Sequence, residues 1–204
     1  MRNLIAILSF SMFLISCTQN IKQPTNDRDR NEDELINQLF WQLVLPISPC
    51  DQRDSTMEGN EIYSSEFYSM IDSEQHEMYI LDTLQKLNAT NYRNIEIPLD
   101  FKQLYINLFD DSSEVRKLNL NLSEILFDLK IKIGFDKDTI NFEKFESQNI
   151  LALIGFSRVS FNEDYSKACF QMSVIQNTEC RQSFLYLADK QSDKWIFKRR
   201  LRLF

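Results

Sequence analysis

Glycine and histidine are scarce in this chain of 204 residues, which has three glycines and one histidine, His76. Loops that cradle phosphates and turns that bind dinucleotides need clustered glycines, so these nucleotide-binding motifs are excluded. There is no Gly-x-Ser-x-Gly turn, and a Ser–His or Cys–His mechanism would have to use His76 alone. The sequence nominates no catalytic constellation, and we expect a protein that is not an enzyme.

Metal-binding patterns are missing as well. The chain has no Cys-x-x-Cys or Cys/His cluster, which argues against structural zinc. The segment that begins at Asp136 starts like a calcium-binding EF-hand loop, but Ile140, Asn141 and Ser147 occupy ligand or turn positions that need other residues. We expect no metal and no cofactor.

No hydrophobic run is long enough to span a bilayer, which takes roughly 20 residues. The longest apolar run, residues 4–15, follows Arg2 and ends at the small residue Ser16. A basic start, a short apolar run and a small residue predict a secretory signal peptide over residues 1–16.

The end of this run, "LISC" at residues 14–17, resembles the lipobox of bacterial lipoproteins. The resemblance implies cleavage before Cys17 and attachment of acyl chains such as palmitate to its thiol. Two or three chains anchor a protein firmly, because each buried methylene adds about 0.8 kcal/mol of membrane affinity. We expect a membrane-anchored protein of the bacterial cell envelope, facing the periplasm or the surface. An ordinary cleaved signal followed by a free Cys17 is the alternative.

Residues 18–33 are polar, with dense mixed charge. Such a stretch cannot bury enough apolar surface to offset its ordering entropy. We therefore expect a flexible tether over residues 17–33 and a single globular domain over residues 34–204.

The chain is acidic, with a net charge of -7, which disfavours nucleic acid as a partner. Its C-terminal segment is basic instead, and a possible binding patch there comprises Lys194, Lys198, Arg200 and Arg202. The alternative is the solvated face of a strand, where cationic side chains discourage edge pairing.

Three cysteines remain if Cys17 carries lipid: Cys50, Cys169 and Cys180. In an oxidising compartment we expect one disulfide between two of them and one buried thiol. With a tight turn near residues 177–178, Ile175 would face Cys180. A direct Cys169–Cys180 bridge therefore needs a longer loop or a shifted register. A disulfide from Cys50 to either of these two cysteines is equally open.

Helical periodicity dominates the N-terminal part. In residues 34–44 the apolar side chains recur every three or four positions, which predicts a helix with one apolar face. A second helical region begins near Glu61. Asp72 or Ser73 is expected to cap a further helix that runs through Leu87.

Alternation with a period of two begins near residue 95. Residues 95–101 predict a half-buried strand that Pro98 confines to an edge. Residues 118–122 alternate too, whereas residues 101–109 and 123–129 fit helix or strand equally well.

The C-terminal third is rich in strand patterns. Residues 130–135 and 150–161 are strand-like, the second as a central strand. Residues 168–176, 181–189 and 194–204 alternate, with Arg199 as a mismatch on the apolar face of the last strand. We therefore predict an α+β fold with N-terminal helices packed on a C-terminal antiparallel sheet, a meander.

The segments "GFSRVSFNEDYSKACF" and "FLYLADKQSDKWIFKRR" resemble the C-terminal meander of a group of exported bacterial lipoproteins of uncharacterised function. The resemblance covers about the last 55 residues and the leader. Its motifs are packing and turn motifs, so it implies no catalytic residues.

These features favour a lipid-anchored, non-catalytic binding domain that contacts an envelope protein or polysaccharide. One alternative is an envelope hydrolase that uses carboxylates, or Asp72 and His76 with a metal ion; the two residues lie one helical turn apart, but two ligands do not make a site. Another is an acidic inhibitor or immunity lipoprotein.

The lipid anchor has a direct test in the variant Cys17→Ala. Because the acyl chains attach to the Cys17 sulfur, the variant is expected to keep its leader and to incorporate no labelled fatty acid, as measured by gel mobility and metabolic labelling. Labelling of the variant would refute the anchor.

Overall fold

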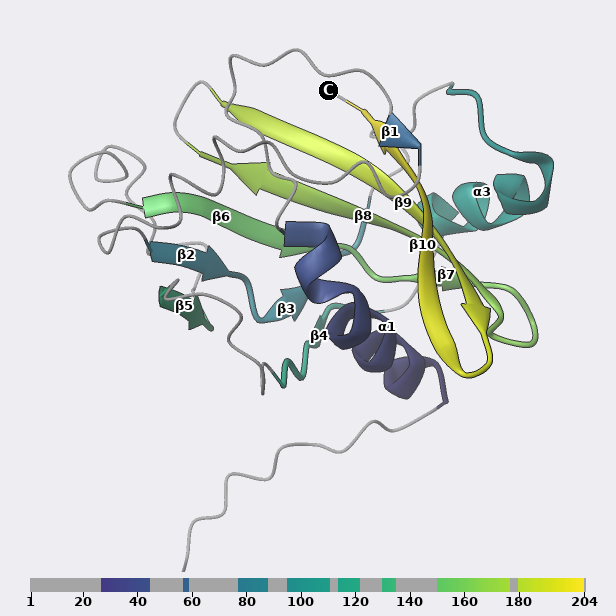
Figure 1. The fold of residues 1–204 in the computed structure, drawn as a ribbon, viewed down its shortest axis with the longest axis horizontal. Helices are drawn as coiled ribbons and strands as arrows, with labels where there is room; N and C mark the ends of the chain where they lie inside the picture. Colours follow the sequence, from purple (N-terminus) through teal and green to yellow (C-terminus); the bar gives the residue numbers. More distant parts are fainter. Residues whose placement is uncertain are drawn as a thin grey trace, which may run out of the picture.

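The fold is built on one mixed sheet, seen in the computed structural model (Figure 1). The structure describes residues 27–44, 57–58, 77–87, 95–110, 114–121, 130–134, 150–176 and 180–203. The predicted signal peptide, Cys17 and Cys50 lie outside these ranges.

Eight strands form the sheet, in the order β1-β10-β9-β8-β6-β2-β5, with β7 pairing to β8. Strand β2 runs parallel to both β5 and β6, and the other pairs are antiparallel. The bounds are β1 Met57–Glu58, β2 Glu77–Ile80, β5 Lys130–Ile133, β6 Ile150–Phe156, β7 Ser160–Phe161, β8 Lys167–Ile175, β9 Arg181–Gln191 and β10 Lys194–Arg202. A separate two-stranded sheet joins β3 Thr83–Leu84 to β4 Arg116–Lys117.

Helices cover the two faces of the sheet. Helix α1, Asp27–Val44, packs its apolar face on one side, against alternate residues of β6, β8 and β9. The 3-10 turn η2, Leu99–Phe101, and helix α3, Lys102–Asp110, pack on the other side, against Leu185, Leu187 and Leu201. Figure 1 shows α1 lying across the near face of the sheet.

The predicted fold class holds in its coarse form, with an N-terminal helix followed by C-terminal antiparallel strands. The helix over residues 34–44 is confirmed, and so are strands at residues 130–133, 150–156 and in the last third of the chain. The sheet is not purely antiparallel, however, because β2 brings two parallel pairings into it.

The helix predicted through Leu87 is wrong over residues 77–87, which form β2, β3 and their connection. Met78 and Ile80 join the core under α1, while Tyr79 and Leu81 pack on the opposite face. A strand that is buried on both faces is continuously apolar, and periodicity cannot distinguish such a short run from a buried helix.

The strand predicted over residues 95–101 is also wrong, since the chain forms η2 there and continues into α3. The N–H of Phe101 donates to the carbonyl of Pro98 at 2.9 Å, which closes the turn. Leu99 is 89% exposed, whereas Ile95 and Ile97 are half-buried and Phe101 is buried, so the apolar alternation is interrupted at Leu99. The segment that fitted helix or strand equally well, residues 101–109, is mostly helix.

The tether predicted to reach Asp33 is too long, because α1 begins at Asp27. Asn31, Glu32 and Asp33 are buried although all three are polar. Their burial depends on partners far away in the sequence, which composition does not reveal.

A β-bulge in β10 explains the mismatch at Arg199. Phe197 pairs with Ala188, but Arg199 pairs with Leu187, so Lys198 is an extra residue in the strand. One inserted residue exchanges the two faces beyond it. Trp195 therefore packs on the α1 side, whereas Leu201 packs on the α3 side.

Two cysteines lie in the described residues. Cys169, near the start of β8, is a free and fully buried thiol, and burial raises its pKa far above the usual range. Cys180 is disulfide-bonded, and its partner lies outside the described ranges. Ile175 faces Arg181 rather than Cys180, so the predicted hairpin register is off by one residue.

Alkylation tests the cysteine assignment. In the unreduced, denatured chain we expect Cys169 to be modified and Cys180 to stay unmodified, with Cys50 as its disulfide partner; reduction frees Cys180. Peptide mass mapping measures this. In the folded chain, the control, Cys169 is expected to resist modification because it is buried. A disulfide peptide containing Cys169 would contradict the assignment.

Candidate functional site

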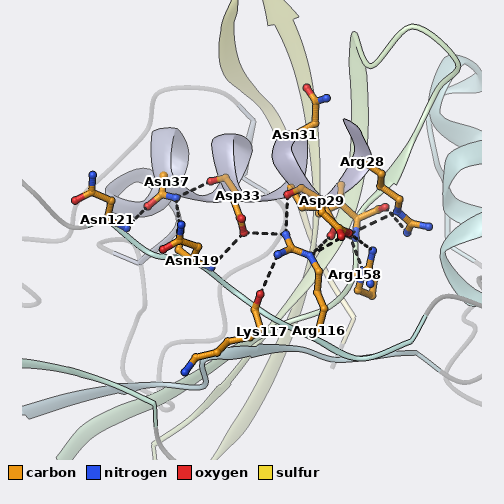
Figure 2. A network of polar contacts seen from close by, with 12 residues as sticks. Arg28, Asp29, Asn31, Asp33, Asn37, Arg116, Lys117, Asn119, Asn121 and Arg158 are labelled. Carbon is orange, nitrogen blue, oxygen red and sulfur yellow. Dashed lines mark hydrogen bonds and ion pairs between the residues drawn. The ribbon is translucent and has the colours of Figure 1, made fainter. Parts of the chain in front are cut away.

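The most elaborate polar cluster in the described part of the chain is a network at the N-terminal half of α1 (Figure 2). Asp29, Asp33 and Asn37 follow one another at four-residue spacing, which places them on one side of the helix. This polar side faces residues 114–121 and the connection between β6 and β7.

Glu32 lies at the centre of the network, with no solvent exposure. Its Oε1 accepts hydrogen bonds from Arg158 Nε at 2.9 Å and from the Val159 N–H at 2.8 Å. Its Oε2 accepts from Arg116 Nε at 2.7 Å. Both carboxylate oxygens are thus engaged, as a buried charge requires.

Two arginines from distant parts of the chain complete the network. Arg158 also donates to the carbonyl of Glu114 at 2.7 Å and to Asp29 Oδ1 at 3.0 Å. Arg116 donates to Asp33 Oδ1 and to the carbonyl of Asp29, both at 2.8 Å. Arg116 therefore joins α1 to β4, and Arg158 joins α1 to the connection between β6 and β7.

Charge within the network balances. Three carboxylates, on Asp29, Glu32 and Asp33, lie among three guanidinium groups, on Arg28, Arg116 and Arg158. Burial by itself would lower the pKa of Arg116, but hydrogen bonds to Asp33 and Glu32 outweigh it, and the pKa is raised. The three acidic and three basic side chains thus lie in direct contact with partners of opposite charge.

Amide and carboxylate side chains of α1 also form hydrogen bonds to backbone groups of residues 119–121. Asp33 Oδ1 accepts from the Asn119 N–H at 3.2 Å, and Asn37 Oδ1 accepts from the Asn121 N–H at 2.7 Å. Asn37 Nδ2 donates to the carbonyl of Asn119 at 2.8 Å. The strand predicted over residues 118–122 is wrong for 118–121, because helix side chains supply the hydrogen bonds that a neighbouring strand would give.

Chemically, this cluster is suited to holding the fold together. A general base needs a carboxylate whose oxygen can take a proton from a substrate, whereas Glu32 is buried and bonded at both oxygens. None of these residues was predicted as part of a site. Two signals were available: a lone arginine in the apolar run 150–161, which needs a partner once buried, and the regular polar spacing in the first turns of α1.

The predicted basic patch is divided by the bulge in β10. Lys194 and Lys198 lie on the α3 side of the strand, and Lys198 pairs with Asp189 at 3.3 Å. Arg200 and Arg202 lie on the α1 side. Arg200 is buried, with its guanidinium 4.8 Å from the centre of the Phe184 ring. The four cations therefore do not form one surface.

The other predicted site residues, Cys17, Cys50, Asp72 and His76, lie outside the described residues, as does the segment that begins at Asp136. Within the described ranges, no group of three or more His, Cys, Asp or Glu side chains is placed to hold a metal ion. No helix there combines the length and apolar character needed to cross a bilayer.

Comparison with known proteins leaves the chain without a match to any family model, curated protein or solved structure. The geometry of its own residues is therefore the basis for a functional proposal.

Removing the central carboxylate tests the role of the network. Glu32→Leu is expected to lower the free energy of unfolding by about 3 to 5 kcal/mol, because Arg116 and Arg158 lose their shared buried partner. Urea denaturation measures this.

Glu34→Gln is the matched control on the same helix. Glu34 is partly exposed and pairs with Lys190 at 3.1 Å, and such a pair contributes less than about 1 kcal/mol. Equal, small losses for both variants would mean that the network does not stabilise the fold.

Proposed function

We propose that this protein is a lipid-anchored interaction domain of the bacterial cell envelope that acts by binding rather than by catalysis. The observation that supports this most directly is that its buried charged side chains form ion pairs with one another. Asp29, Glu32, Asp33, Arg116 and Arg158 bind one another and fasten α1 to the sheet. They form a rigid support, which is what a domain that presents a binding surface requires.

The position of this support suits an anchored protein. In the proposal, Cys17 carries the lipid and residues 18–26 are the tether, which extends at most about 30 Å. Helix α1 follows the tether directly, so a force between membrane and domain acts first on the end of the helix that holds Asp29 and Glu32.

We further propose that β8, β9 and β10 form the antiparallel meander of the predicted fold class and that this part of the domain faces the partner. Consecutive strands pair over long registers there. Rigidity of the partner surface lowers the entropic cost of binding. An envelope protein or polysaccharide is the proposed partner.

Complementation separates this function from the hydrolase alternative. In cells that lack the protein, the double variant Asp72→Asn, His76→Ala is expected to restore the wild-type phenotype, because binding does not use these groups. Cys17→Ala is expected to fail, because its domain is not attached in the envelope.

Immunoblotting is the control for the amount of each variant. Loss of complementation by the double variant at a normal protein level would overturn the proposal and favour a hydrolase. Full complementation by an unlipidated Cys17→Ala protein would remove the anchor from the function.

A further inference from the structure

A row of small residues crosses the sheet on the face away from α1. Gly155 of β6 pairs with Ser173 of β8, and Ser173 pairs with Ser183 of β9. Side chains on neighbouring strands normally fill the space above a sheet, so small residues in register, such as Gly155 and Ser173, leave space that larger side chains would occupy. The side chain of Leu81 lies close to the backbone of Gly155, because a Cβ added to Gly155 would lie 3.0 Å from Leu81 Cδ1.

A pocket of about 180 Å³, partly open to solvent, occupies one end of this row. Its floor includes Gly155 and Ser173. Leu81, Leu153 and Ile175 provide apolar walls. An apolar protein cavity of about 150 Å³ is large enough to bind benzene, so this pocket has room for a molecule the size of one aromatic ring.

One lining residue has an unused hydrogen-bonding group. Gln171 is only 6% exposed, and its Oε1 is buried without a hydrogen-bond partner in the described part of the chain. Its Nε2 donates to Ser173 Oγ at 3.4 Å, and its backbone N–H donates to Ser157 Oγ at 2.9 Å. A buried acceptor that lacks a donor carries a desolvation cost, which a ligand with a donor would relieve.

The charge of the lining restricts the ligand. None of the described residues that form the pocket is ionisable, and a charged ligand would lose its hydration without a counter-charge. The apolar walls favour a hydrocarbon ring, and the Gln171 amide requires an O–H or N–H group on that ring. The amide can turn about its last side-chain bond, where the torsion is broad.

We propose that this pocket is a binding site for a small, neutral, ring-sized molecule with one hydrogen-bond donor, such as a phenol, and that the donor is bound by Gln171 Oε1. The site is separate from the network of Glu32 and does not depend on the lipid anchor.

Fluorine NMR on the full-length purified chain tests the site with two probes of nearly equal size, 4-fluorophenol and fluorobenzene. The wild-type protein is expected to bind 4-fluorophenol about five- to tenfold more tightly, because only the phenol donates to Gln171. Equal affinities, or no binding of either probe, would overturn the proposal.

Three variants locate the binding. Ser173→Leu fills the hollow and is expected to abolish binding of both probes. Gln171→Leu is expected to keep fluorobenzene binding and to remove the preference for the phenol. Ser183→Ala is the control. It removes a buried hydroxyl that has no hydrogen-bond partner among the described residues and is not one of the described residues lining the pocket. The affinities of this variant for both probes are expected to be unchanged.

Circular dichroism melting establishes that each variant is folded. Should Gln171→Leu fail to fold, the probe comparison on the wild-type chain still decides the proposal. Unchanged binding in folded Ser173→Leu would place the ligand elsewhere and refute the assignment.

Discussion

The buried carboxylate of Glu32 is the interaction on which the arrangement of this protein depends. Its two arginine partners lie 84 and 126 residues away in the sequence. By binding both, Glu32 joins α1 to β4 and to the connection after β6. The apolar face of α1 supplies most of the burial, but such contacts are not directional. The ion pairs fix where along the sheet the helix lies.

The parts of the fold that the sequence predicts are those governed by local periodicity. The apolar face of residues 34–44 and the alternation in β8 and β9 each follow from side chains that point to one layer. In the sequence, the only sign of the bulge in β10 is the charged Arg199 at a position expected to be apolar. Such an exception can be a charged residue on an unshifted strand or a change of register, and the alternation alone does not distinguish the two. Strand β2 is short and buried on both faces, so its sequence shows no alternation of apolar and polar residues that would identify a strand.

The network and the pocket were missed for a different reason, because both depend on contacts between distant parts of the chain. Asp29, Glu32 and Asp33 are indistinguishable by composition from the solvated charges of a tether, and only the approach of Arg116 and Arg158 makes their burial favourable. The hollow beside Gln171 arises from Gly155 and Ser173, which are neighbours only through strand register. Of the predicted sites, the described structure addresses the basic patch, which the bulge divides, and two of the cysteines, of which Cys180 is bonded and Cys169 is free.

Cys169 has a consequence for the order of events during biosynthesis. Its thiol is free and buried in β8. Cys180 directly precedes β9 and is disulfide-bonded to a different cysteine. In an unfolded chain the two thiols are separated by a short loop, and short loops close at low entropic cost. Oxidation before the hairpin forms would therefore favour the wrong pairing. Once β8 and β9 have paired, the Cys169 thiol is enclosed in the sheet, and this wrong pairing is no longer accessible.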